Sequence, residues 1–350
     1  MKKLAAGLLV LVIAAYASLE HIVPIVFSRV LIQRLGTDAS QTLPDGLHVG
    51  LCGAGSPLPD PERSPPCTLV IAGSKMFLFD VGSSANIGGM GFNAGNVDGI
   101  FLTHFHSDHI GNLGEVMMQR WVAGNHTSPL TVFGPKGVDQ VVSGFNQAYA
   151  LDSTYRTAHH GEDIAPTNGK GGLAIEFQTT AEALTPVFAE NGVTISAFNV
   201  AHSPVEPAVG YLVTYKGRSV AISGDTTAES SLFKHAKGAD LLVHEAMSME
   251  LVELAEKSAR EAGQKTLEKI FFDIRDYHSA PEDIARKAQE AEIGFIAFTH
   301  IVPMLPLPGM EQIFVGNSED LFSGEVVVGR DGDFFSLLPG TDKITTSNLL

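Results

Sequence analysis

The stretch Thr103-His104-Phe105-His106-Ser107-Asp108-His109 decides how this chain is interpreted. It places three imidazoles and one carboxylate within six residues, directly after the apolar run 97–103. The following residues, 110–120, have helical spacing, so the cluster is predicted to lie in a loop between a buried strand and a helix. Neutral imidazole and carboxylate are ligands that zinc prefers, and three protein ligands plus water define a catalytic site. The stretch therefore predicts a catalytic metal centre.

Three further candidate ligands each follow an apolar run that predicts a strand. His202 follows 195–201, Asp225 follows 220–223 and His300 follows 295–299. A lone histidine in such a place is more often structural, but suitable residues at four separate strand ends favour one shared site. The predicted metal ligands are His104, His106, Asp108, His109, His202, Asp225 and His300.

The rest of the chain predicts an α/β fold. Runs rich in β-branched and aromatic residues, broken by Gly, Pro and Asp, predict strands. A helix is expected to begin at a capping box, Ser279-x-x-Glu282, and to end at about Glu292. Strands precede helices in each half, which favours two mixed β-sheets packed between helical layers, an αββα sandwich. The predicted strands lie within 47–52, 68–82, 97–103, 130–133, 193–200, 209–215, 219–223, 241–244 and 295–299.

Composition indicates one main globular domain, predicted over 47–340. The chain has 350 residues with 44% apolar content, enough to bury a large core. Acidic residues outnumber basic ones, 39 against 23, giving a formal net charge of −16. Such a charge repels polyanions, so a nucleic-acid partner is disfavoured.

The N-terminal segment differs from the rest in kind. Lys2 and Lys3 precede a small and apolar run, 4–19, which is typical of an export signal. Ala15 and Ala17 supply an A-x-A cleavage site, although retention as an anchor also stays open. We predict a signal peptide or membrane anchor over 1–35, a linker over 36–46, and an exported protein, periplasmic or attached to the membrane by this segment.

The two cysteines, Cys52 and Cys67, are fifteen positions apart on either side of a Gly- and Pro-rich stretch. In an oxidising compartment they would pair. Two buried thiols near the starts of adjacent strands are the alternative. The sequence favours neither.

A lid-like insertion is predicted at about 150–185. Residues 152–182 are polar, Gly-rich and without clear periodicity, which indicates a long loop. Arg156 would receive an anionic group, and Tyr155 and His159 would contact the substrate beside it. An ordinary surface loop is the competing interpretation.

The motifs together resemble a known family. The pattern His-x-His-x-Asp-His, a later His, a Gly-Asp-Thr and a last Thr-His are similar to the metal signature of metallo-β-lactamase-fold hydrolases. The likeness spans about 47–302. Gly53-Ala54-Gly55-Ser56 and His278-Ser279 resemble the ribonuclease Z branch in particular. The resemblance implies two Zn²⁺ ions, one held by His104, His106 and His202, the other by Asp108, His109 and His300, with Asp225 bridging.

The resemblance also implies a mechanism. Two such ions lower the pKa of a water between them to near 7 and clamp the oxygens of the substrate. Asp108 would orient the resulting hydroxide, and His278 would donate a proton or hydrogen bond to the leaving oxygen. Ala280 stands where the family usually has Thr, a departure beside His278. Glu245 would orient His278, with a plain buried ion pair as the alternative.

Substrate class rests on departures from the ribonuclease Z pattern. Those enzymes carry a long tRNA-binding arm between the middle His and the bridging Asp, but only 23 positions separate His202 from Asp225. With the export signal and the acidic balance, this resembles the arylsulfatase members. The main prediction is therefore a small anionic ester as the substrate, either a sulfate ester or a small phosphodiester, because a two-zinc site clamps a tetrahedral anion.

Several alternatives stay open. They are ribonuclease Z-type 3′-tRNA cleavage, a lactonase or β-lactamase with Tyr155 or Tyr211 as electrophile, and a non-catalytic metal-binding member. Fe or Mn would accept similar ligands. A homodimer is expected from the resemblance alone.

Overall fold

The structure is a computed structural model describing residues 16, 19–32, 38–180, 182–228 and 231–350. It divides into two compact units, 1–42 and 43–350. In the first unit, residues 19–32 form an exposed helix and η1 (Ala39–Gln41) is a single 3₁₀ turn. Most of the predicted export signal lies outside the described residues. No described helix combines the length and apolar character needed to cross a membrane.

The first sheet of the second unit has eight strands in the order β15-β14-β1-β2-β3-β4-β5-β6. Pairing is antiparallel from β15 to β3 and parallel from β3 to β6. The strands are β1 (Leu47–Gly53), β2 (Cys67–Ala72), β3 (Lys75–Phe79), β4 (Gly99–Phe101), β5 (Leu130–Gly134), β6 (Gly172–Glu176), β14 (Asp333–Leu337) and β15 (Ile344–Asn348).

The second sheet has seven strands in the order β13-β12-β11-β10-β9-β8-β7. Its hairpins run antiparallel from β7 to β10, and the strands from β10 to β13 are parallel. The strands are β7 (Thr185–Glu190), β8 (Val193–Asn199), β9 (Val209–Tyr215), β10 (Arg218–Ile222), β11 (Leu241–Met247), β12 (Phe295–Val302) and β13 (Glu325–Val328).

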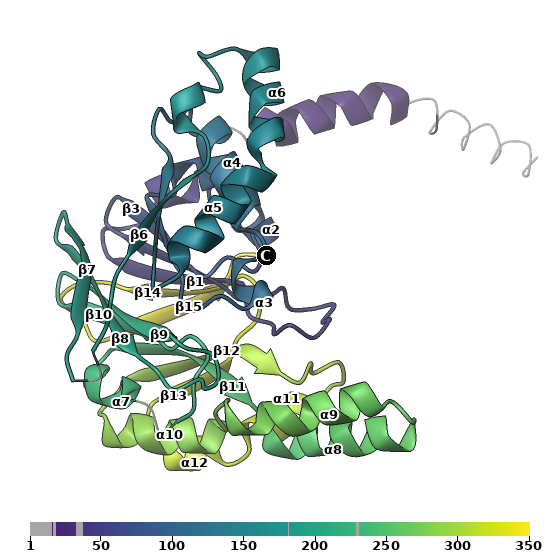
Figure 1. Cartoon of the computed structure of the whole chain (residues 1–350), viewed down its shortest axis with the longest axis vertical. Coiled ribbons are helices and arrows are strands. Elements are labelled where there is room, and N and C mark those ends of the chain that lie inside the picture. Colours follow the sequence, from purple (N-terminus) through teal and green to yellow (C-terminus); the bar gives the residue numbers. More distant parts are fainter. Residues whose placement is uncertain (1–15, 17–18, 33–37, 181, 229–230) are drawn as a thin grey trace, which may run out of the picture. The chain divides into compact units, whose positions relative to one another are not determined.

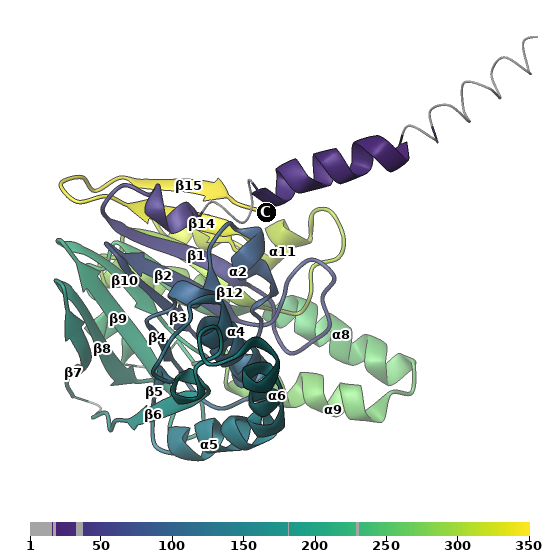
Figure 2. The ribbon, with the colours of Figure 1, turned by 90° about the horizontal axis from the view of Figure 1, so that it is seen from above.

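Helices cover the outer faces of both sheets (Figures 1 and 2). Beside the first sheet lie α2 (Ala85–Gly89), α3 (Ser107–Ile110), α4 (Leu113–Ala123), α5 (Val138–Ala148), α6 (Ala150–His160) and the 3₁₀ turns η2 (Ala94–Asn96) and η3 (Thr167–Gly169). Beside the second lie α7 (Leu232–His235), α8 (Met249–Glu261), α9 (Lys265–Asp273), η4 (Ile274–Asp276), α10 (Pro281–Glu290), α11 (Met310–Val315) and α12 (Ser318–Leu321).

The main core lies between the sheets. Phe79 and Phe101 of the first sheet pack edge-on against Tyr211 of the second, with ring centroids 5.2 and 5.7 Å apart. A second apolar cluster, including Phe298 and Ile284, joins the second sheet to α10. Large aromatic burial of this kind dominates the hydrophobic stabilisation of a core. The predicted αββα sandwich of two mixed sheets is therefore confirmed.

Two local predictions were wrong. Residues 152–182 are not one long loop, because most of α6, then η3 and β6 lie there, and the amphipathic spacing of α6 is hidden by its polar composition. The capping box is also absent. Helix α10 is capped by Ala280 without a side-chain bond, and Ser279 Oγ instead donates to the Thr226 carbonyl at 2.7 Å.

Two boundaries also differ from expectation. Strand β15 continues the first sheet to Asn348, past the predicted domain end at 340. Cys52 and Cys67 are joined by a disulfide, which settles the open alternative in favour of pairing. The bond closes the loop 53–66 between β1 and β2.

Candidate metal centre

The seven predicted ligands come together where strands of both sheets end. His104 and His106 follow β4, and α3 carries Asp108 and His109. From the second sheet come His202 after β8, Asp225 after β10, and His300 within β12. Their ligand atoms form two groups, each within 4.8 Å internally: His104, His106 and His202 with Asp225, and Asp108, His109 and His300. We call these the first and second donor groups.

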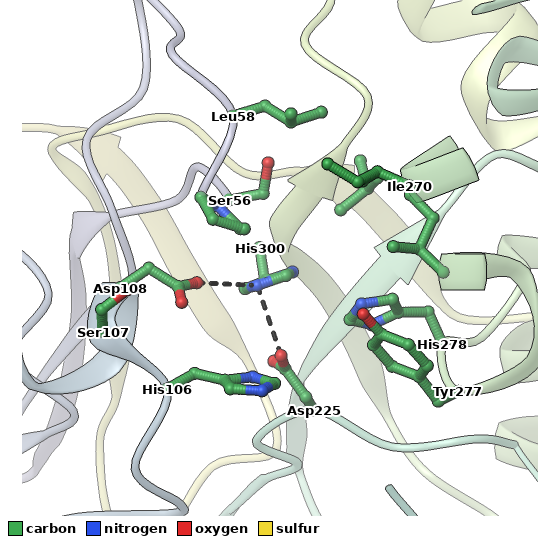
Figure 3. Close-up of a pocket in the computed structure, with 13 residues that line it drawn as sticks. Ser56, Leu58, His106, Ser107, Asp108, Asp225, Ile270, Tyr277, His278 and His300 are labelled. Atoms are coloured by element: carbon green, nitrogen blue, oxygen red, sulfur yellow. Dashed lines mark hydrogen bonds and ion pairs between the residues drawn. The ribbon is translucent and has the colours of Figure 1, made fainter. Parts of the chain in front are cut away.

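Asp225 links the two donor groups. Its Oδ2 lies 3.7 Å from His104 Nε2 and 3.8 Å from His202 Nε2, both of the first group. Its carboxylate also lies 3.3 Å from His109 Nε2 of the second group. It lies 3.4 Å from His300 Nε2 of the same group (Figure 3). Asp225 therefore occupies the bridging position that the resemblance implied.

His300 reaches the centre because β12 contains a bulge. Glu245 pairs with Thr299 and Ala246 with Ile301, so His300 is the extra residue of the register shift. Its φ of 46° lies in the left-handed region, which is uncommon for a residue with a Cβ. Bulges redirect side chains at active sites, and strained backbone concentrates there. His300 Nε2 consequently comes within 3.3 Å of Asp108 Oδ2.

Asp80, at the end of β3, fixes the orientation of His109. Its Oδ2 accepts a hydrogen bond from His109 Nδ1 at 2.8 Å and another from Thr103 Oγ1 at 2.7 Å. The Thr103 backbone N–H donates to Asp80 Oδ1 at 2.8 Å. This contact leaves His109 Nε2 free to face the donor groups, as outer partners of metal-binding histidines generally do. Sequence analysis missed Asp80, although a carboxylate ending the apolar strand 75–79 was a signal.

The donor atoms fit a metal. Among the described residues of the donor groups, His109 Nε2, His202 Nε2 and Asp225 Oδ1 are buried without a hydrogen-bond partner. Buried polar atoms are almost always satisfied, so an unsatisfied group of this kind needs an explanation. Imidazole nitrogens and carboxylate oxygens gathered from two sheets suit a divalent cation such as zinc.

The two donor groups differ in electrostatics. Burial lowers the pKa of His104, His106 and His202, so these imidazoles are neutral at neutral pH. Burial is the largest single effect on His109 and His300 and alone would lower the pKa of both, but the carboxylates together, Asp225 with Asp80 for His109 and Asp225 with Asp108 for His300, outweigh it and raise both. The metal-free second group therefore holds protons more firmly than the first.

A pocket of about 250 Å³ opens over the centre. In Figure 3, His106, Asp108, Asp225 and His300 lie along one side of it, while Leu58 and Ile270 lie on the other. His278 and Tyr277 form a further wall. A small pocket with a few convergent polar groups is the expected form of a ligand site.

His278 is held by Glu245. Glu245 Oε2 lies 3.2 Å from His278 Nδ1, and its Oε1 accepts from the Ser279 backbone N–H at 2.8 Å. Both side chains are buried, His278 with 8% of its surface exposed and Glu245 with 1%. The contact fits both sequence-based interpretations of Glu245, orientation of His278 and a plain buried ion pair, so the orienting role stays a prediction.

A comparison with known protein families agrees with this architecture. The family model described as "Metallo-beta-lactamase superfamily" matches residues 60–273. The chain belongs to the metallo-β-lactamase superfamily. It is a hydrolase of that fold, and members of this superfamily hold divalent metals at such His and Asp clusters.

Among curated members of the superfamily, the chain is similar to proteins named Ribonuclease Z. It is 35% identical to the one from Mycobacterium bovis (strain BCG / Pasteur 1173P2) over 81% of this chain and 96% of that protein. It is 36% identical to the one from Mycolicibacterium paratuberculosis, with the same coverage. The predicted ribonuclease Z-like branch is thereby confirmed.

Solved structures of the superfamily share the fold. The metallo-β-lactamase fold protein YhfI from Bacillus subtilis matches with a TM-score of 0.59 and 22% identity, over 84% of this chain and 100% of that chain. Human tRNase Z, short form, matches with a TM-score of 0.55 and 21% identity, over 82% of this chain and 98% of that chain. At these identities the likeness concerns the fold alone.

The three predicted substrate-binding residues lie elsewhere. Tyr155, Arg156 and His159 are on α6, and none is among the residues lining the pocket. Tyr155 is 65% exposed, and Arg156 donates to Asp152 one helical turn away at 2.7 Å. The structure does not bring these residues to the centre, because α6 is a surface helix packed beside α5. Tyr211 is not available as an electrophile, because its buried hydroxyl donates a hydrogen bond to the Leu102 carbonyl.

Sequence analysis missed most of the pocket wall. The lining includes Ser56 and Leu58 from loop 53–66, and Ile270, Ile274 and Tyr277 from the end of the α8–α9 hairpin. Apolar residues in a helical pattern indicate core, so nothing in the sequence marks Ile270 or Ile274 as pocket residues. Tyr277, directly before His278, was the one with a signal.

Replacing Asp80 tests the orientation of His109. We expect Asp80→Asn to weaken metal binding by about 10- to 100-fold, because His109 would lose the acceptor that fixes its ring. Metal affinity, measured by competition with a chromogenic chelator, checks this. Asp98→Asn is a matched control. Asp98 accepts hydrogen bonds from the Lys75 side chain and the Met76 backbone N–H, at the opposite end of β3 from Asp80. Unchanged affinity in Asp80→Asn would contradict the orienting role.

Metal binding should depend on pH differently at the two groups. Protons compete with metal, and the raised pKa of His109 and of His300 means that a metal must displace their protons at neutral pH. As pH falls, we expect the second donor group to lose metal at a higher pH than the first. Calorimetric titration in buffers of different ionisation enthalpy measures the protons released. Equal pH dependence at both groups would count against the distinction.

Proposed function

We propose that this protein is a metal-dependent phosphodiesterase with ribonuclease Z-type chemistry. The observation that carries the proposal is the arrangement of two donor groups bridged by Asp225 on one side of a pocket that also presents His278. Such a site suits a tetrahedral ester, and the names of the curated relatives favour phosphate over sulfate. Sulfate ester cleavage, the main prediction from sequence, lacks comparable support.

The proposed cofactor is two Zn²⁺ ions, which the first and second donor groups, including Asp225, would hold. When bound, such ions lower the pKa of a coordinated water and polarise phosphoryl oxygens. Asp108 faces the pocket, with its carboxylate held by His300, and orients the attacking water. His278 donates a proton to the leaving oxygen, and the Glu245 carboxylate, with Oε2 3.2 Å from His278 Nδ1, positions His278 through an ion pair.

A small diester or a free chain end suits the pocket better than a long polyanion. None of the described residues lining the pocket is Lys or Arg. The segment between His202 and Asp225 is mainly the hairpin of β9 and β10, with a tight turn at Lys216-Gly217. Cleavage of tRNA 3′ ends is the second candidate, and the names of the relatives favour it.

Turnover and metal content together test the proposal. Purified protein lacking residues 1–35 is loaded with zinc and assayed on bis-nitrophenyl phosphate, nitrophenyl sulfate and a tRNA precursor. We expect about two bound zinc ions and diester cleavage at least ~100-fold faster than sulfate cleavage. Faster sulfate cleavage would restore the arylsulfatase interpretation, and tRNA cleavage alone would select the second candidate.

We also propose that the protein is exported, retained in the periplasm or at the membrane. The support is the leader with Lys2 and Lys3 before an apolar run, and the Cys52–Cys67 disulfide, since disulfides persist in oxidising compartments. Fractionation of cells expressing the full chain tests this. We expect the protein outside the cytoplasm with no free thiol, whereas cytoplasmic protein with two alkylatable thiols would overturn the proposal.

A further inference from the structure

One side of the pocket is an apolar wall, which we define as Leu58, Ile270, Ile274 and Val302. Two of its members, Leu58 and Ile270, lie across the pocket from His106 and Asp225 (Figure 3). The wall is built from three separate parts of the chain: loop 53–66, the end of the α8–α9 hairpin with η4, and β12. Ile270 is 42% exposed, so part of its hydrocarbon surface is accessible to a ligand in the pocket.

The loop that carries Leu58 is held firmly. The Asp331 carboxylate accepts from the Ala54 backbone N–H at 2.9 Å and from the Ser64 backbone N–H at 2.8 Å. Asn86 Nδ2 donates to the Cys52 carbonyl at 2.9 Å, and the Cys52–Cys67 disulfide closes the base of the loop. The loop half of the wall is therefore preformed, which lowers the cost of ordering on binding.

The hairpin that carries Ile270 is braced in the same way. Arg260 at the end of α8 donates to Glu268 of α9 and to Glu256 of its own helix, both at 2.6 Å. Arg275 of η4 lies 3.3 Å from Glu256. These ion pairs join α8, α9 and η4, so Ile270 and Ile274 are presented on a fixed support.

The charges around the wall exclude a second anionic group. Asp108 and Asp225 are the ionised acidic side chains lining the pocket, and the lining described contains no Lys or Arg. A further phosphate beside the reacting one would meet hydrocarbon on the wall and no cation. Desolvating a charge without a partner is costly, whereas burying hydrocarbon is favourable.

We propose that the apolar wall selects the ester group that stays on phosphorus after cleavage, and that this group is aryl or branched hydrocarbon. The inference rests on the proposed phosphodiesterase function and names its substrate class. The ring of Tyr277, which also lines the pocket, adds an aromatic surface beside the wall. A pocket of this kind discriminates by about 10- to 200-fold for small changes in apolar bulk.

Two diesters with one leaving group test the selection. Phenyl 4-nitrophenyl phosphate and methyl 4-nitrophenyl phosphate differ only in the retained group. We expect the zinc-loaded protein to prefer the phenyl diester in kcat/KM by about 10-fold or more. Ile270→Ser should remove most of that preference, by raising KM for the phenyl diester several-fold more than KM for the methyl diester.

Leu267→Ser is the matched control, because Leu267 lies on the same helix with the same 42% exposure but does not line the pocket. We expect it to leave both diesters unchanged. Binding of phenyl phosphate against inorganic phosphate, measured by calorimetry, gives a readout independent of turnover. Tighter binding of phenyl phosphate, lost in Ile270→Ser, supports the wall even for a chain that cleaves neither diester.

The outcomes separate the two proposals. Cleavage of neither diester would overturn the phosphodiesterase function. Equal cleavage of both, or an equal loss on both in Ile270→Ser, would overturn the selective role of the wall and leave the function standing. An effect of Leu267→Ser as large as that of Ile270→Ser would likewise overturn it, because the helix rather than the wall would be responsible.

Discussion

Asp225→Ala is expected to abolish hydrolysis and to release metal from both donor groups. The Asp225 carboxylate lies within 3.8 Å of an imidazole nitrogen of each of four histidines, two in each group. Its loss would remove the one anionic side chain shared by both groups and leave buried imidazoles to repel one another on protonation. We expect kcat/KM to fall by at least about 10³-fold, equivalent to ~4 kcal/mol of transition-state stabilisation.

Metal analysis after dialysis, with turnover on the same sample, measures this effect. Asp283→Ala is the control, because Asp283 pairs with Arg286 on the surface of α10. A folded Asp225→Ala protein that keeps two metals and more than about a tenth of its activity would refute the bridging role.

The second large effect is expected for His278→Ala. Loss of a positioned general acid typically costs 10²- to 10⁴-fold. The cost should depend on the leaving group: about 10²-fold or more for an alkyl alcohol, which needs a proton, and far less for nitrophenol, which does not. Rates for a series of diesters with leaving groups of rising pKa measure the difference between variant and parent.

Metal content separates this role from metal binding. His278 groups with Asp225 and His300 as possible ligands, so a ligand role would also reduce activity. We expect His278→Ala to keep its metal, and Glu245→Gln to give a smaller loss with the same leaving-group trend. Loss of metal, or a loss of rate that is uniform across leaving groups, would contradict the role of His278 as a general acid.

The grouping of the seven candidate ligands was predictable from sequence because their signal is local and dense. His104 to His109 fall in one short loop, and His202, Asp225 and His300 each end an apolar run, so strand prediction alone places them together. The bulge that turns His300 inward was not predictable, since it depends on register between β11 and β12.

The pocket wall was not predictable, because residues from separate parts of the chain form it only in the tertiary structure. Ile270 and Leu58 lie far apart in sequence and have the character of ordinary apolar residues. The sequence drew attention instead to Arg156 and its neighbours, whose polarity suits a solvated helix as well as a lid. Chemistry-bearing residue types point to a metal centre, whereas the selectivity proposed for the wall depends on hydrocarbon side chains that are also common in cores.

The candidate ligands are divided between the two sheets, so a bound metal would connect two parts of the chain. Four ligands precede the connection from β6 to β7, and three follow it, so a protein cut in that connection would be a pair of fragments that each hold an incomplete site. Strands β14 and β15 from the second fragment would complete the sheet of the first. Metal should then act as an assembly factor, tightening fragment association in proportion to its concentration. Fragments that associate equally well with and without metal would show that the sheets alone hold the halves together.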